Sequence, residues 1–100
     1  MDFKVVWTEP AIQNLREIGA YISRDNPSAA IKFGEDLFRH VEVLETFPFI
    51  GPAYPRGAAK TTREIIFRKY LVFSCVSEEQ KLVEILAIWH GAQDNPVLGE

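Results

Sequence analysis

Apolar positions along this chain follow two patterns, one with helical spacing and one typical of strands. In the first half, apolar side chains recur every three or four residues from Ile12 to Ile22 and again from Ala30 to Leu44, which predicts two amphipathic helices. Four short runs rich in β-branched and aromatic residues predict strands instead. These runs lie at 3–7, 63–68, 70–76 and 82–90.

Capping residues mark the ends of the two helices. Thr8 offers its hydroxyl to the first turn of the first helix, which is expected to end near Arg24. Asn26 caps the second helix and Pro27 suits its first turn, while the residue before a proline avoids helical geometry. Because the link between the helices is so short, they are predicted to form an antiparallel hairpin.

A loop rich in proline and glycine, residues 46–60, separates the helices from the last three strands. Phe47, Phe49 and Tyr54 are expected to anchor this loop to the core, because exposed aromatic side chains are unfavourable in a monomer. Consecutive strands joined by short polar links form an antiparallel meander. We therefore predict a single α+β domain over residues 1–100, in which a helical hairpin packs on an antiparallel sheet in the order strand, helix, helix, three strands.

The composition is that of a folded protein, and its charge is distributed unevenly. Hydrophobic residues make up 47% and charged residues 25%, as in ordinary globular chains, and the net charge of −3 argues against binding nucleic acid through bulk charge. Residues 1–45 carry −3, residues 46–76 carry +4 and residues 77–100 carry −4. The basic middle segment could face a phosphate backbone or an acidic partner, or it could pair with the acidic flanks.

The outward face of the second helix carries charges of both signs, which is typical of a solvated face. Glu35 and Arg39 lie four residues apart in the order that favours an ion pair, and Asp36 lies beside them. We expect these side chains to stabilise the helix and not to form a binding site.

Several classes of protein and of site have no support in the sequence. Cys75 is the only cysteine and lies in an apolar run, so it is expected to be a buried thiol without a disulfide partner in the chain. The sequence contains no metal-ligand spacing, no cofactor motif and no phosphate-binding glycine loop. No apolar run is long enough for a membrane helix and the first residues do not form a signal peptide, so we expect a cytoplasmic protein.

His90 is a candidate for acid–base chemistry or phosphate binding, because it ends the last predicted strand. The other histidine, His40, lies fifty residues away on the second helix. Ser74, Ser77 and Cys75 have no motif that marks a nucleophile. The residues alone therefore predict a small α+β domain with one basic segment.

A series of short motifs in a fixed order carries more information than any one of them. The series begins with Trp7-x-x-x-Ala11-x-x-x-Leu15-x-x-Ile18-x-x-Tyr21-Ile22 and Asn26-Pro27-x-Ala29-Ala30-x-x-Phe33. It continues with Leu44-x-x-x-Pro48-x-x-Gly51, Arg63-Glu64, Tyr70 with Phe73, and Ile88-x-His90-Gly91-x-x-Asp94-x-Pro96. In this order the motifs cover nearly the whole chain, which resembles the RelE/ParE superfamily of bacterial toxins.

The resemblance implies a toxin of a type II toxin–antitoxin module, with the same order of strands and helices as predicted above. It also implies a partner, a cognate antitoxin whose C-terminal segment wraps across the hairpin and the sheet, so that the two proteins form a hetero-oligomer. Apolar residues of the helical stripes are the expected docking surface for that segment. They are Ile12, Leu15, Ile22, Phe33 and Leu37.

The superfamily has two branches with different activities. RelE-like toxins are ribosome-dependent messenger RNA endonucleases that use cationic residues on the sheet. The candidates for such catalysis here are Arg63, Arg68 and His90. Ala92 and Gln93, however, stand where many relatives carry arginine, and no Arg or Lys follows Lys81. The set of cationic residues expected of a nuclease is therefore incomplete, which favours a toxin that does not act as an enzyme.

ParE-like toxins instead poison DNA gyrase by binding it, and the net charge of −3 favours this branch because the nuclease members are basic. The target surface is expected to combine the basic segment with the end of the last strand. Its candidate residues are Arg56, Lys60, Arg63, Arg68, His90 and Gln93. Two alternatives stay open: a RelE-like endonuclease that cleaves messenger RNA on the ribosome, and a relative that has lost toxicity but still binds the antitoxin.

Overall fold

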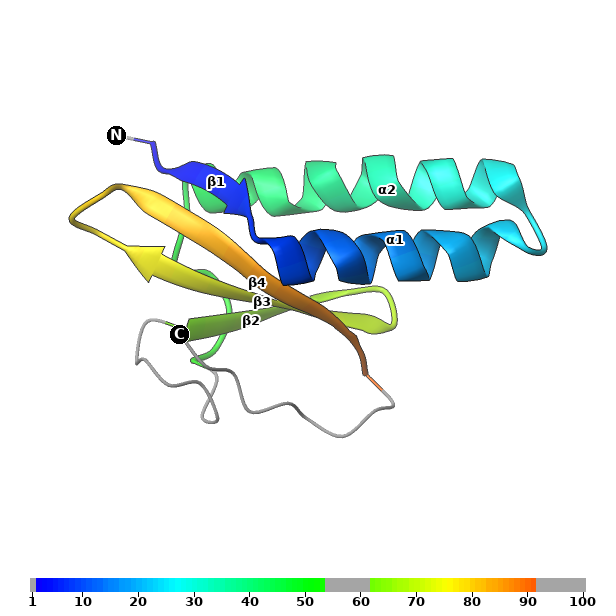
Figure 1. Cartoon of the computed structure of the whole chain (residues 1–100). Helices are drawn as coiled ribbons and strands as arrows, with labels where there is room; N and C mark the ends of the chain where they lie inside the picture. The colour runs from blue at the N-terminus through cyan, green and yellow to red at the C-terminus, as the bar shows by residue number, and fades with distance from the viewer. Residues whose placement is uncertain (1, 54–61, 92–100) are drawn as a thin grey trace.

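A helical hairpin covers one face of a sheet in the computed structural model, which describes residues 2–53 and 62–91 (Figure 1). Helices α1 (Glu9–Ser23) and α2 (Pro27–Val41) lie side by side, and a short 3-10 helix, η1 (Glu42–Glu45), follows α2 directly. The predicted α+β architecture with two helices between the first strand and the other three is confirmed.

The sheet has four strands in the order β1-β4-β3-β2. The strands are β1 (Lys4–Trp7), β2 (Thr62–Phe67), β3 (Tyr70–Ser77) and β4 (Leu82–His90). The last three form the predicted antiparallel meander, whereas β1 pairs parallel with β4, so the whole sheet is mixed and not purely antiparallel. A parallel pair requires a long crossover, which the helices that follow β1 provide.

The helix boundaries agree with the capping residues in the sequence. The Thr8 side chain accepts a hydrogen bond from the Ala11 N–H, and the Asn26 side chain accepts one from the Ala29 N–H. α1 ends with Arg24 as its C-cap, as predicted. Within the described part of the chain, neither helix has the length and apolar character that crossing a membrane requires.

The core lies between the hairpin and the sheet. α2 contributes a buried stripe at the predicted helical spacing, and β2, β3 and β4 contribute the facing side chains. Its members are Ala11, Phe33, Leu37, Val41, Leu44, Ile65, Phe67, Val72, Val76, Val83, Ile85 and Ile88. Leu15, Ile18 and Ile22 of α1 pack against this cluster while staying partly exposed.

The start of the 46–60 loop is held by its backbone and not by its aromatic rings. The Phe47 and Phe49 side chains are exposed, so the prediction that they anchor the loop was wrong, and Tyr54 lies outside the described residues. Gly51 adopts φ +89°, and a Cβ at this position would lie 2.3 Å from the Glu64 carbonyl oxygen, which only glycine avoids. The loop therefore packs its main chain directly against β2.

Candidate functional site

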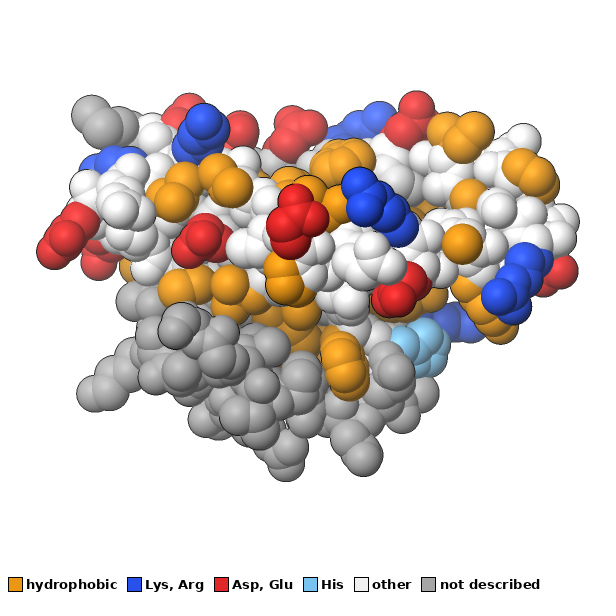
Figure 2. All heavy atoms as spheres, viewed as in Figure 1, with side chains coloured by type: hydrophobic (Ala, Val, Ile, Leu, Met, Phe, Trp, Pro, Cys, Tyr) orange, Lys and Arg blue, Asp and Glu red, His pale blue; other side chains and the backbone are white. Residues whose placement is uncertain are grey.

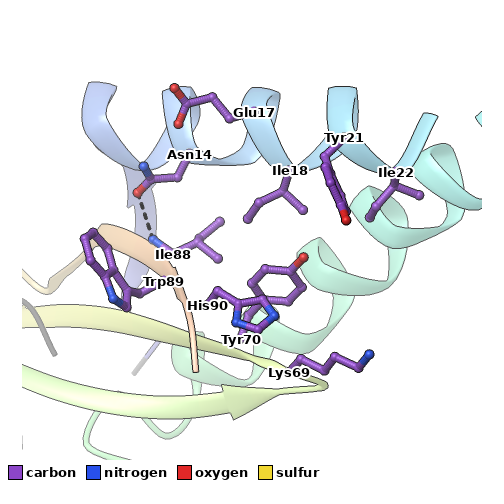
Figure 3. Close-up of a pocket in the computed structure, with 10 residues that line it drawn as sticks. All are labelled: Asn14, Glu17, Ile18, Tyr21, Ile22, Lys69, Tyr70, Ile88, Trp89 and His90. Atoms are coloured by element: carbon purple, nitrogen blue, oxygen red, sulfur yellow. Dashed lines mark hydrogen bonds between the residues drawn. The ribbon is translucent and has the colours of Figure 1, made fainter. Parts of the chain in front are cut away.

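A groove of about 690 Å³ opens between α1 and the ends of β3 and β4. β4 runs obliquely away from α1 toward its C-terminal end (Figure 1), which leaves the later turns of the helix partly uncovered. The apolar walls come from Ile18 and Ile22 on α1 and Ile88 on β4. The close-up in Figure 3 shows these side chains facing one another across the groove.

Two tyrosines place their hydroxyl groups in this groove. Tyr21 of α1 and Tyr70 of β3 point toward each other (Figure 3). Burial raises the pKa of the Tyr70 hydroxyl above 10.0, and the nearby Tyr21 raises it further. At neutral pH Tyr70 is therefore a neutral hydrogen-bond donor. The His90 ring lies edge-on to Tyr70, with 5.3 Å between the ring centroids.

Two hydrogen bonds from backbone N–H groups fix the position of the C-terminal end of β4. The Asn14 side-chain oxygen accepts a hydrogen bond of 3.0 Å from the Ile88 N–H, which joins α1 to β4. The Gly91 N–H donates a hydrogen bond of 2.8 Å to the Lys69 carbonyl oxygen in the turn between β2 and β3. The groove is thus formed by elements that are tied to each other, as a preformed binding site requires.

Arg68 occupies the turn between β2 and β3, one residue beyond the strand, and is held against α2. Its φ of +56° is in the left-handed region. Its guanidinium group lies 4.9 Å from the centroid of the Phe67 ring and 5.6 Å from that of Phe33. One terminal nitrogen donates a hydrogen bond of 2.6 Å to a carboxylate oxygen of Asp36. Arg68 therefore acts mainly in linking the turn to the helix.

Asp36 is the centre of a cluster of cations. Lys32 lies 3.3 Å from one carboxylate oxygen and Arg39 lies 3.2 Å from the other, in addition to the Arg68 contact. The predicted pairing of Arg39 with Glu35 is therefore replaced by a pairing with Asp36. Burial opposes ionisation of Asp36, but hydrogen bonds and charges from Lys32 and Arg68 outweigh it, so its pKa lies below 3.8.

Arg63 lies on β2, far from His90. Its guanidinium group lies 5.3 Å from the centroid of the Phe49 ring. Arg63 is opposite Ser74, whereas His90 is opposite Tyr70 at the other end of β3. Four positions along β3 correspond to roughly 13 Å, and two inter-strand spacings add to this. Arg63 is thus separated from His90 along the sheet, whereas Arg68 lies in the turn that adjoins the His90 end of β4.

The remaining predicted residues fall into three groups. Arg56, Lys60 and Gln93 lie outside the described residues. Ile12, Leu15 and Ile22 lie on α1 with intermediate exposure. Phe33 and Leu37 are only 3% and 0% exposed, because this stripe of α2 faces the sheet. Their prediction as docking residues for a partner is corrected, since they belong to the core.

Sequence reasoning did not assign the groove itself to any role. Lys69 was counted only within the basic segment, and Tyr21 and Tyr70 only as motif positions. Nothing in the sequence indicates that Tyr21 and Tyr70 line one groove, because α1 and β3 are far apart along the chain. Asp36 was assigned to a solvated face, since its contact with Arg68 spans 32 positions of the chain.

The surface chemistry around the groove suits a mixed apolar and polar ligand. Charges of both signs are interspersed over the face of the hairpin seen in Figure 2, without a continuous basic stripe among the described residues. In residues 2–53 and 62–91, no three side chains of His, Cys, Asp or Glu lie together as metal ligands would. The described lining of the groove combines aliphatic side chains with two tyrosines and with the charged side chains of Glu17 and Lys69.

Comparison with known sequences places the chain in a family and finds a curated relative. Residues 5–95 match the family model described as ParE toxin of the type II toxin–antitoxin system parDE. The chain is 34% identical over 95 residues to Y4kP of Sinorhizobium fredii, a curated protein whose name assigns it provisionally to the toxins. That alignment covers 93% of each chain.

Solved structures show the same fold at lower identity. The chromosomal ParDE toxin–antitoxin system from P. aeruginosa gives a TM-score of 0.71 at 22% identity, covering 88% of this chain and 95% of that one. A mutant of the E. coli toxin RelE in the free state gives 0.66 at 17% identity, covering 92% and 86%. The RelBE2 toxin–antitoxin complex from Mycobacterium tuberculosis gives 0.60 at 20% identity, covering 90% and 99%.

Proposed function

This chain belongs to the ParE toxin family of type II toxin–antitoxin systems, and from that premise we propose that it stops growth by binding DNA gyrase, without cleaving RNA. Toxins of the ParE and RelE kind share this fold, so the choice between binding and catalysis depends on how the side chains are placed.

The observation that carries the proposal is the dispersal of the cationic candidates. An RNA-cleaving site needs several cations around one phosphate, where they stabilise the charge of the transition state. Here Arg68 is committed to Asp36 and to two aromatic rings, and Arg63 lies over Phe49 at another register of the sheet. Arg63 is therefore separated from His90 along the sheet, and the Arg68 guanidinium group is engaged by Asp36, although its turn adjoins the end of β4. A surface of this kind supports recognition of a protein better than phosphate chemistry.

A cognate antitoxin is the second partner that we propose, and with it a hetero-oligomer in the cytoplasm. The solved relatives include toxin–antitoxin complexes, which supports such a partner. Because Phe33 and Leu37 are buried, we place the antitoxin segment on apolar side chains that the hairpin exposes. Ile31 is 65% exposed and Phe38 46% exposed on α2, and both are available together with Ile12 of α1.

The proposal is tested by comparing two reactions with the same purified protein. We expect the protein to inhibit supercoiling by DNA gyrase and to leave messenger RNA intact on translating ribosomes. Addition of the antitoxin should restore supercoiling. Cleavage of messenger RNA on the ribosome, lost in Arg68→Ala, would instead identify the protein as a RelE-like endonuclease.

Expression in cells separates toxicity from antitoxin binding. Induction of the chain alone should arrest growth and induce the DNA-damage response, and co-expression of the antitoxin should prevent both. Tight binding of the antitoxin combined with harmless expression would contradict the proposal and identify a relative that has lost toxicity.

A further inference from the structure

The groove between α1 and the ends of β3 and β4 combines two kinds of surface within one volume. Ile18, Ile22 and Ile88 give it aliphatic walls of a size that accommodates one large apolar side chain. Lys69 and Tyr70, which follow each other in the chain, place an ammonium group and a phenol at its lower margin (Figure 3). An apolar anchor and a small number of fixed polar groups are the usual composition of a recognition pocket.

The polar groups at this margin are donors. Tyr70 is protonated at neutral pH, since the ordinary pKa of tyrosine is already about 10 and both burial and the neighbouring Tyr21 raise it further, so its hydroxyl can donate a hydrogen bond. Lys69 is exposed and makes no ion pair with any of the described residues. At the C-cap of α1, outside the lining of the groove, the Arg24 guanidinium group lies 5.8 Å from the centroid of the Tyr21 ring. This margin therefore favours an anionic acceptor.

We propose that this groove receives a segment of the target protein that places an aliphatic or aromatic side chain between Ile18, Ile22 and Ile88 and an Asp or Glu carboxylate against Lys69 and Tyr70. The inference rests on the proposed function in one respect, namely that the target is a protein. It goes further by naming the surface and the chemistry of the segment that binds there.

An RNA ligand fits this groove less well than an acidic peptide. Binding to a phosphate backbone depends on many cations along one track, whereas the described margin has Lys69 with aliphatic walls behind it. Glu17 also lines the groove, and its carboxylate is directed away from the two hydroxyls in Figure 3. It would repel a phosphate chain that continued along α1, but it leaves room for one carboxylate near Lys69.

The chemistry of the groove is tested by nuclear magnetic resonance on the full chain, without any assumption about gyrase. Three probes are titrated: a short peptide that alternates Asp with Leu and Phe, the same peptide with Lys in place of Asp, and an oligouridylate of equal length. We expect the acidic peptide to shift the methyl signals of Ile18, Ile22 and Ile88 and to bind more tightly than the other two. Equal or tighter binding of the basic peptide or the RNA at these methyl groups would overturn the proposal.

Variants identify the groups that hold the carboxylate. Tyr70→Phe should weaken binding of the acidic peptide by about tenfold, the effect of losing a hydrogen bond to a charged group. Lys69→Glu should weaken it at least as much, because it also places a like charge beside the peptide carboxylate. Lys4→Glu is the matched control, because Lys4 is also exposed but lies on β1, away from the groove. It should bind the peptide as the unmodified chain does.

A gyrase-binding measurement distinguishes failure of this proposal from failure of the proposed function. If the unmodified chain binds gyrase and Lys69→Glu binds it equally well, the groove is not the target site, although the proposed function stands. If the chain does not bind gyrase but the acidic peptide still occupies the groove, the proposed target is wrong and the assignment of the groove is retained.

Discussion

The two ends of α1 meet the sheet in different ways. At the N-terminal end, the Thr8 hydroxyl donates a hydrogen bond of 2.7 Å to the Ile85 carbonyl oxygen, and Ala11 and Ile85 are both 0% exposed. At the C-terminal end, Ile22 stays half-exposed beside the groove. The strands of a twisted sheet turn away from a straight helix, so close contact along the whole of α1 is not possible. α1 thus has a closed N-terminal end that packs tightly on the sheet and an open C-terminal end that borders the groove.

The largest expected effect is the difference in the free energy of unfolding between an Ile→Ala substitution at the closed end and one at the open end. Ile85→Ala removes a fully buried side chain at the closed end and should lower the free energy of unfolding by about 2–5 kcal/mol, since the cavity it leaves cannot collapse fully. Ile22→Ala removes a side chain that is already half in water and should cost about 1 kcal/mol. Urea unfolding followed by circular dichroism measures both.

Equal losses for the two variants would contradict this comparison. They would show that the groove is closed in solution and that Ile22 is as well packed as Ile85. The groove would then have to open before any ligand could enter.

The helices and the meander could be predicted from the sequence better than the groove. Thr8, the stripe from Ile12 to Ile22 and the cap at Asn26 are local signals, because a helix sets their spacing within a few residues. The meander followed likewise from three consecutive runs with short links. These signals predicted the element order and most of the core.

The parallel pairing of β1 and the groove depend on contacts between distant parts of the chain. β1 carries no residue that specifies β4 as its neighbour, and the Asp36–Arg68 ion pair joins residues that are 32 positions apart. The stripe on α2 was correctly predicted as apolar, but periodicity does not tell whether such a stripe faces the sheet or a partner. For this reason Phe33 and Leu37 were assigned to the wrong surface.

A smaller loss of stability is expected on removal of the Thr8 hydroxyl, which joins the N-terminal end of α1 to β4. Thr8→Ala removes both the helix cap and the hydrogen bond to Ile85, and should lower the free energy of unfolding by about 1 kcal/mol. Ser23→Ala is the matched control at the other end of α1, because the Ser23 hydroxyl donates a hydrogen bond to the Ala20 carbonyl oxygen of its own helix and to no other group in the described part of the chain. It should change stability by less than about 0.5 kcal/mol. A loss at Ser23 as large as at Thr8 would show that both ends of α1 contribute equally.

The smallest effect concerns Asp36, which connects α2 to the turn at the open end through Arg68. The folded structure lowers the pKa of Asp36 below 3.8, because its cationic neighbours outweigh the burial that opposes ionisation. The carboxylate therefore contributes stability above about pH 3.8, and this contribution is lost as the pH falls through the lowered pKa. Asp36→Asn should be slightly less stable than the unmodified chain at neutral pH, and the difference should vanish in strong acid.

Two further measurements show whether the ion pair acts on the open end in particular. Urea unfolding between pH 2 and pH 7 gives the difference in stability, and hydrogen exchange at Gly91 reports on its bond to Lys69 in the same turn. Glu35→Gln serves as the control, since Glu35 is exposed on the same helix and forms no ion pair among the described residues. A difference for Asp36→Asn that persists unchanged in strong acid would mean that the substitution acts through packing. Faster exchange at Gly91 in Asp36→Asn but not in Glu35→Gln would instead show that the Asp36–Arg68 ion pair, which lies outside the groove, holds the turn beside the groove in place.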